Sequence, residues 1–201
     1  MIKISEMFVS LQGEGKYCGN KVLFIRLSGC NKKCSFCDSS YHNEGKDMVN
    51  GEVVEKILKS GCDKVVWTGG EPMLQKEQVQ DVILRTTIKH HMIETNGTIL
   101  DKDFFDFLYY SAFSPKCLDD LKAVKQFVFG FSGEYDIKIV TDGEKIGMDM
   151  IDDATMLMPL SVYEEEKDFE IKKKVWELCI EKNKIYCPRI HVDVFGKKRG
   201  I

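Results

Sequence analysis

The sequence lacks any long hydrophobic run. No apolar stretch approaches the roughly 18 residues that suggest a membrane span, so we expect no membrane partner. The first residues, MIKISEMFVSLQGEG, also lack the apolar block and small-residue cleavage site of a secretory signal. Together these absences predict a cytoplasmic protein.

Positive charge is not in excess either. The chain has 29 Lys and Arg against 32 Asp and Glu, which gives a net charge of -3. This balance disfavours a broad basic face for duplex nucleic acid, so we expect a small-molecule partner and no nucleic acid. Internal repeats, low-complexity tracts and linkers are also missing. A chain of 201 residues is long enough for one substantial core, and we predict a single domain over 1–201.

Short β-branched runs bounded by turn residues recur along the chain and predict strands. They alternate with helical patterns, of which 51–61, 74–90 and 164–183 are the clearest. Such alternation indicates βαβ units and a mostly parallel sheet. A full eight-unit barrel needs about 250 residues, so we predict an α/β fold with a partial, open TIM-type barrel of about six mostly parallel strands. The predicted strands are 22–28, 64–69, 91–97, 109–114, 136–141 and 154–160.

The two ends of the chain fall outside this alternation. We expect residues 5–21 and 186–201 to pack across one mouth of the sheet.

Three of the eight cysteines lie close together in LSGCNKKCSFCDSS, with the spacing C-x3-C-x2-C. A structural zinc site wants four ligands, usually as two pairs, but the sequence has no second C-x2-C and only His42 nearby. A 4Fe-4S cluster usually takes four cysteinates, so three ligands leave one iron open to a substrate or cofactor. The other five cysteines are predicted to be packing residues: Cys18, Cys62, Cys117, Cys179 and Cys187.

The segment TGGEP, residues 68–72, follows a predicted strand. In open α/β sheets chemistry collects beyond the carboxyl ends of the strands. The glycines permit close backbone approach, and Glu71 offers an acceptor for an ammonium group. No nucleophile or triad accompanies these motifs, which indicates that a cofactor carries the chemistry while the protein positions it.

The cysteine spacing, with Phe36 before the last cysteine, and the TGGEP segment resemble the radical S-adenosylmethionine superfamily. Further segments narrow the resemblance and extend it over nearly the whole chain. SLQGEGKYCG, FIRLSGCNKKCSFCDSSY, WTGGEPMLQ, IETNGT, FSPK and HVDVFGKKRGI are together similar to the 7-carboxy-7-deazaguanine synthases.

This resemblance implies a radical S-adenosylmethionine fold and a lyase that uses a 4Fe-4S cluster, S-adenosylmethionine and Mg²⁺. The implied reaction converts 6-carboxy-5,6,7,8-tetrahydropterin to 7-carboxy-7-deazaguanine with loss of ammonia, for queuosine-type nucleosides. The resemblance also implies a homodimer and an electron donor such as flavodoxin or ferredoxin.

Carried over position by position, the resemblance assigns the cluster to Cys30, Cys34 and Cys37, and magnesium to Ser39, where many relatives have threonine. The implied S-adenosylmethionine contacts are Phe36, Cys37, Asp38, Gly70, Glu71, Glu94, Asn96, Ser114, Pro115, Lys116, Met158, Pro159, Leu160 and Ser161. The implied substrate contacts are Leu11, Gln12, Gly13, Glu14, Arg26, Thr68 and Ile201. Two positions depart from the family's pattern: relatives often carry glutamine at Met158 and asparagine at Lys197.

Several positions keep a second interpretation. Arg26 can pair with a structural acid such as Glu14 instead of the substrate, Ser39 can be a plain turn residue, and Lys138 can face either the cavity or solvent. His191 can be a packed or hydrogen-bonded residue, which we favour, or a catalyst, and structural roles are expected for His90 and His91.

Two other functions also stay open. One is a glycyl-radical activase, which would share the cysteine spacing but act on a partner protein. The other is a non-catalytic iron–sulfur or zinc module.

Overall fold

The structure is a computed structural model that describes residues 1–37 and 43–201. The predicted cofactor contact Asp38 and the predicted magnesium ligand Ser39 lie outside the described residues.

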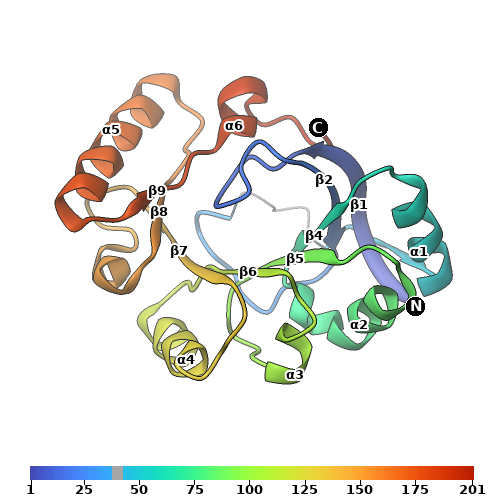
Figure 1. Cartoon of the computed structure of the whole chain (residues 1–201). Helices are drawn as coiled ribbons and strands as arrows, with labels where there is room; N and C mark the ends of the chain where they lie inside the picture. The colour runs from blue at the N-terminus through green and yellow to red at the C-terminus, as the bar shows by residue number, and fades with distance from the viewer. Residues whose placement is uncertain (38–42) are drawn as a thin grey trace.

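The described residues form one nine-stranded sheet in the order β3-β1-β2-β4-β5-β6-β7-β8-β9. Neighbours from β2 to β9 run parallel, whereas β1 is antiparallel to both β2 and β3. The sheet curves around a central space, with helices outside it, and stays open between its two edges (Figure 1). The predicted open barrel is confirmed. The strands are β1 (Ile2–Leu11), β2 (Lys21–Leu27), β3 (Lys46–Met48), β4 (Lys64–Gly69), β5 (His90–Thr95), β6 (Tyr110–Phe113), β7 (Tyr135–Thr141), β8 (Met156–Pro159) and β9 (Ile185–Tyr186).

Each predicted strand corresponds to a parallel strand of the barrel, namely β2, β4, β5, β6, β7 and β8. The expectation for the ends of the chain was partly wrong. Residues 5–11 do not lie across the mouth, because β1 pairs along β2 with Met7 opposite Ile25. Buried Ile2 and Ile4 flank an exposed Lys3, the alternation of a strand with one covered face.

Apart from α6, which has no buried residue, the helices lie outside the sheet and bury apolar side chains against it. In α1, for example, Val53 and Ile57 are buried. Predicted helices 51–61, 74–90 and 164–183 correspond to α1, to η1 with α2, and to α5. The helices are α1 (Asn50–Lys59), η1 (Pro72–Gln75), α2 (Lys76–Arg85), α3 (Lys102–Phe105), α4 (Leu118–Val128), η2 (Met148–Asp153), α5 (Glu165–Lys182) and α6 (Ile190–Phe195).

Alternation along the strands separates two environments. On β4, Val65 and Trp67 pack in the main core beneath the helices. Val66 belongs to a smaller cluster inside the barrel, and Thr68 lines the cavity above it. Because successive side chains point to opposite faces, the inner residues at the strand ends are the ones that can reach a bound molecule.

Among the described residues, no helix combines the length and the apolar character needed to cross a membrane. Of the cysteines expected to be packing residues, Cys62, Cys179 and Cys187 are buried as predicted. Cys117 is exposed, so that expectation was wrong for it.

Candidate active site

A cavity of about 1090 Å³ opens at the mouth of the barrel. Most of the sequence-predicted site residues line it, although they come from strand ends and loops along the whole chain. They are Leu11, Gln12, Gly13, Glu14, Arg26, Cys30, Cys34, Phe36, Cys37, Thr68, Gly70, Glu94, Asn96, Ser114, Lys116, Met158, Leu160 and Ile201. Four predicted contacts are not among its lining residues: Glu71, Pro115, Pro159 and Ser161.

One wall of the cavity carries Cys30, Cys34 and Cys37 as free thiols. Burial raises the pKa of the Cys34 thiol; Lys116 opposes the shift, while Cys37 and Cys30 add to it, so the three sulfurs influence one another. Within the described ranges, no group of three acidic, His or Cys side chains converges on a single metal ion. A cubane does not need that convergence, because each cysteinate binds a different iron. The donor set therefore suits a 4Fe-4S cluster with one open iron.

The backbone of the glycine-rich segment packs directly on the cysteine loop. A Cβ at Gly70 would lie 1.9 Å from the carbonyl oxygen of Gly29, a distance that no side chain can adopt. The amide of Glu71 donates to the same Gly29 oxygen at 2.8 Å. Glycine at position 70 therefore allows the loop after β4 to support the loop that bears the cysteines.

Glu71 differs from its expected role as an acceptor for an ammonium group. The residue is fully buried. Its Oε1 accepts from the Thr95 hydroxyl at 2.7 Å and the Met73 amide at 3.0 Å, and its Oε2 accepts from the Asn96 amide at 2.7 Å. The carboxylate therefore joins the loops after β4 and β5 instead of facing the cavity.

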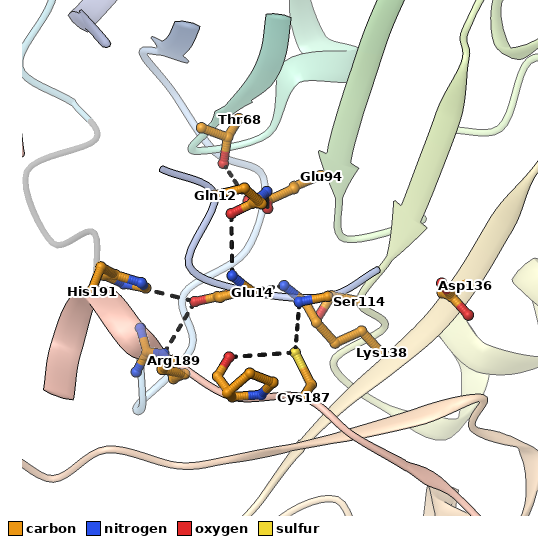
Figure 2. Close-up of polar contacts among 12 residues, drawn as sticks. Gln12, Glu14, Thr68, Glu94, Ser114, Asp136, Lys138, Cys187, Arg189 and His191 are labelled. Atoms are coloured by element: carbon orange, nitrogen blue, oxygen red, sulfur yellow. Dashed lines mark hydrogen bonds and ion pairs between the residues drawn. The ribbon is translucent and has the colours of Figure 1, made fainter. Parts of the chain in front are cut away.

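The cavity is also lined by a polar set, Gln12 from the loop after β1, Thr68 from β4 and Glu94 from β5. Glu94 accepts hydrogen bonds from Gln12 Nε2 and from the Thr68 hydroxyl, both at 3.0 Å (Figure 2). The sequence prediction placed Glu94 on the cofactor side. The structure groups it instead with Gln12 and Thr68, two predicted substrate contacts.

Glu14 lies next to this set and forms ion pairs with two cationic side chains. Lys138 Nζ lies 2.6 Å from Oε2 of Glu14, and Arg189 Nε lies 3.1 Å from Oε1. Lys138 faces the cavity, which was one of the two interpretations of its position. His191 also lines the cavity and lies 3.9 Å from Glu14, so it is not a remote packing residue.

Arg26 pairs with an acid, but not with the one suggested by the sequence. Its Nε lies 3.0 Å from Glu6 Oε2. In the C-terminal tail, the residues after α6, Arg199 Nε lies 3.1 Å from Oε1 of the same carboxylate. Glu6 therefore connects β1, β2 and the tail at the edge of the cavity.

The remaining cavity wall is polar and cationic near the cysteine loop. Lys116 Nζ donates to the Ser114 hydroxyl at 3.0 Å and lies 5.9 Å from the centre of the Phe36 ring. Asn96 donates to Asn31 at 2.9 Å, which ties the loop after β5 to the cysteine loop.

His91 has the structural role expected of it. It is buried, accepts from Trp67 Nε1 at 3.1 Å, and has its other ring nitrogen 2.9 Å from the Thr86 hydroxyl.

Sequence reasoning missed Glu6 and Arg189. Neither belongs to a motif, and their importance depends on pairings between the two ends of the chain. The only signal in the sequence was that the two end segments contain charged residues beside recognisable motifs. That signal does not single out a particular residue.

The comparisons with known proteins agree with this geometry. The family described as the Radical SAM superfamily matches residues 24–136. The 7-carboxy-7-deazaguanine synthase of Rhodopirellula baltica is 31% identical, with 98% of this chain and 88% of that protein covered. The enzyme of the same name from Bacteroides thetaiotaomicron is 38% identical, with 74% of this chain and 75% of that protein covered. The chain belongs to this family.

The structural comparison supports the fold of the 7-carboxy-7-deazaguanine synthase family. The crystal structure of QueE from Escherichia coli has a TM-score of 0.58 and 19% sequence identity, with 92% of each chain covered. At that identity the likeness concerns the fold alone. Membership of the family makes the chain a radical S-adenosylmethionine enzyme of the lyase type, with a 4Fe-4S cluster and S-adenosylmethionine as its cofactors.

Proposed function

We propose that this chain converts 6-carboxy-5,6,7,8-tetrahydropterin to 7-carboxy-7-deazaguanine and ammonia, the step that makes the deazapurine core of queuosine-type nucleosides. One observation carries the proposal. The three cysteines line the same cavity as Gln12, Glu14, Thr68 and Glu94. Cofactor and substrate can therefore meet in one space.

In this proposal, Cys30, Cys34 and Cys37 would hold three irons of the cluster. When bound, the cluster and S-adenosylmethionine would supply a 5′-deoxyadenosyl radical that removes hydrogen from C6 of the pterin. Phe36, Asn96, Ser114, Lys116, Met158 and Leu160 line the cavity and are our candidates for contacts to S-adenosylmethionine. Gly70 would contribute its backbone.

The polar set would recognise the flat heterocycle. Glu14 and Glu94 are acceptors for the N–H groups of an amino-pyrimidinone edge, and Gln12 can both donate and accept. Arg26 presents a planar guanidinium suited to the substrate carboxylate. Leu11, Gly13 and Ile201 would border the ring. We now place Glu94 with the substrate, because its two hydrogen bonds are to Gln12 and Thr68.

The conversion is a redox-neutral rearrangement in which the substrate loses one ammonia, so S-adenosylmethionine is regenerated in each turnover. The chain would therefore contribute position, orientation and exclusion of water.

Three parts of the proposal rest on the family resemblance alone: a magnesium ion held by the Ser39 hydroxyl, a homodimer, and flavodoxin or ferredoxin as electron donor. A single domain over 1–201 and a cytoplasmic location rest on the sequence composition. A Ser39→Ala variant with an unchanged magnesium requirement would remove the metal role.

The test is an anaerobic assay of the reconstituted protein with the tetrahydropterin, S-adenosylmethionine, a strong reductant and magnesium. Mass spectrometry should find 7-carboxy-7-deazaguanine without net consumption of S-adenosylmethionine. The C30A, C34A and C37A variants should be inactive, whereas C117A, which changes an exposed cysteine, should keep turnover. Cleavage of S-adenosylmethionine with an intact pterin would refute the substrate.

A further inference from the structure

Glu14 lies at the centre of a buried ionic cluster assembled from three distant parts of the chain. Its side chain is 12% exposed, and those of Lys138 and Arg189 are each 6% exposed. Lys138 comes from β7, and Arg189 precedes α6, at a separation of 175 residues from Glu14. Figure 2 shows both cations directed at the one carboxylate.

Backbone contacts fasten the same two segments together. The Ile190 amide donates to the Gly13 carbonyl at 3.1 Å, and the Gly15 amide donates to Cys187 Sγ at 3.0 Å. A Cβ at Gly13 would lie 2.2 Å from Nδ1 of His191, so the glycine leaves room for that ring. Residues 187–191 therefore form a support for the loop that carries Gln12 and Glu14.

A buried carboxylate is costly unless cations and hydrogen-bond donors compensate it. Burial, the largest single influence, would raise the pKa of Glu14, but Lys138, Arg189 and His191 together outweigh it and hold that pKa well below its usual range. Burial likewise would lower the pKa of Lys138, but Glu14 and Glu94 outweigh it and hold that pKa above its usual range. The charges of the cluster therefore favour the ionised state of both groups.

The cluster leaves Glu14 able to bind a ligand. Each carboxylate oxygen can accept two hydrogen bonds, and the two cations occupy different oxygens. Glu14 also lines the cavity. It can therefore accept a pair of N–H groups from the edge of a planar heterocycle, in an orientation fixed by the cations behind it.

We propose that Arg189 and Lys138 are positioning residues for substrate recognition, which hold the Glu14 carboxylate in place to read the amino-pyrimidinone edge of the pterin. Residues 187–191 are thereby part of the substrate site, a role that no motif in this segment predicts. This inference rests on the proposed function and adds the residues that determine its selectivity.

The experiment measures selectivity between two stable ligands. The reconstituted holoenzyme with S-adenosylmethionine is titrated by fluorescence with 6-carboxypterin and with 6-carboxylumazine, in which an oxo group replaces the 2-amino group. The variants are R189M, R189K and K138M. R85M is the matched control, because Arg85 makes a single-helix ion pair with Asp81 on the exposed surface of α2.

The wild type and R85M should bind the pterin more tightly than the lumazine. R189M and K138M should lose about ten- to a hundredfold of that preference, the range expected for hydrogen bonds to a charged group, and R189K should lie between. Turnover at saturating pterin should fall much less than kcat/KM, and binding of S-adenosylmethionine should stay unchanged.

The outcomes separate the two proposals. If a variant melts at a lower temperature but keeps the wild-type preference, the cluster only stabilises the fold and the inference is wrong. If R189M does not fold, the preference for the pterin over the lumazine in R189K and K138M decides whether the inference holds. If the wild type itself neither binds the pterin nor turns it over, the proposed function fails.

Discussion

The carboxylate of Glu71 accepts a hydrogen bond from the backbone amide of Asn96 at 2.7 Å and so joins the loops that follow β4 and β5. Glu71→Gln keeps the size of the side chain but leaves a donor facing one of the three N–H or O–H groups that Glu71 now accepts. An unpaired buried group costs about 1–3 kcal/mol, and urea unfolding should show a loss of that size. Glu77→Gln, on the exposed side of α2, is the control and should change stability by less than about 0.5 kcal/mol. Equal stability of both variants would contradict the structural role of Glu71.

Acid should destabilise the protein through His91. Burial lowers the pKa of His91 from 6.5 to about 4, so the folded chain keeps this ring neutral while the unfolded chain protonates it. The neutral ring makes its full contribution to the free energy of unfolding above pH 6.5. This contribution is lost as the pH falls toward 4, at about 1.4 kcal/mol per pH unit. Unfolding curves measured across that interval should show this slope in the wild type and in His90→Gln, but a reduced slope in His91→Gln. An unchanged slope in His91→Gln would assign the acid sensitivity to other groups.

The sequence was sufficient for β2 and for β4 to β8, because each is a short, mostly apolar run between turn residues, a local property. It was insufficient for β1. Residues 2–11 contain polar and charged side chains, and their pairing with β2 and β3 is a long-range property. The cysteine spacing and the glycine-rich segment were visible for the same local reason. The Glu14 cluster and the buried role of Glu71 were not, because long-range pairing decides which carboxylate faces a cavity and which is covered.

Gly70 should not tolerate a side chain. In Gly70→Ala the new Cβ would meet the Gly29 carbonyl, which cannot move without displacing Cys30. We expect a loss of about 1–3 kcal/mol, the usual cost of overpacking, and a lower yield of iron and sulfide per chain on reconstitution. Gly51→Ala is the matched control, because nothing lies within 4 Å of a Cβ there and α1 should gain up to about 1 kcal/mol. Full cluster loading in Gly70→Ala would show that the cysteine loop adapts.

Tyr163 has a positive φ of 62°, a backbone conformation that is rare for aromatic residues. The Asp168 carboxylate holds this conformation by accepting hydrogen bonds from the backbone amides of Val162 at 2.6 Å and Tyr163 at 3.0 Å. The ring then lies beneath Lys197 of the C-terminal tail, with 4.5 Å between Nζ and the ring centre. Since both residues line the cavity, we expect the strained turn to anchor the tail beside the site.

Tyr163→Gly should relieve the strain and release the tail at the same time. Removing a left-handed non-glycine residue gains about 1 kcal/mol, which offsets the lost cation–π contact of about 0.5–1 kcal/mol. Stability should therefore stay close to that of the wild type. Trypsin should nevertheless cut faster after Lys197, Lys198 and Arg199, as mass spectrometry of the released tail would show. Tyr163→Phe keeps both the ring and the strain and should be cut at the wild-type rate. Equal cleavage of the glycine and phenylalanine variants would mean that the ring does not hold the tail.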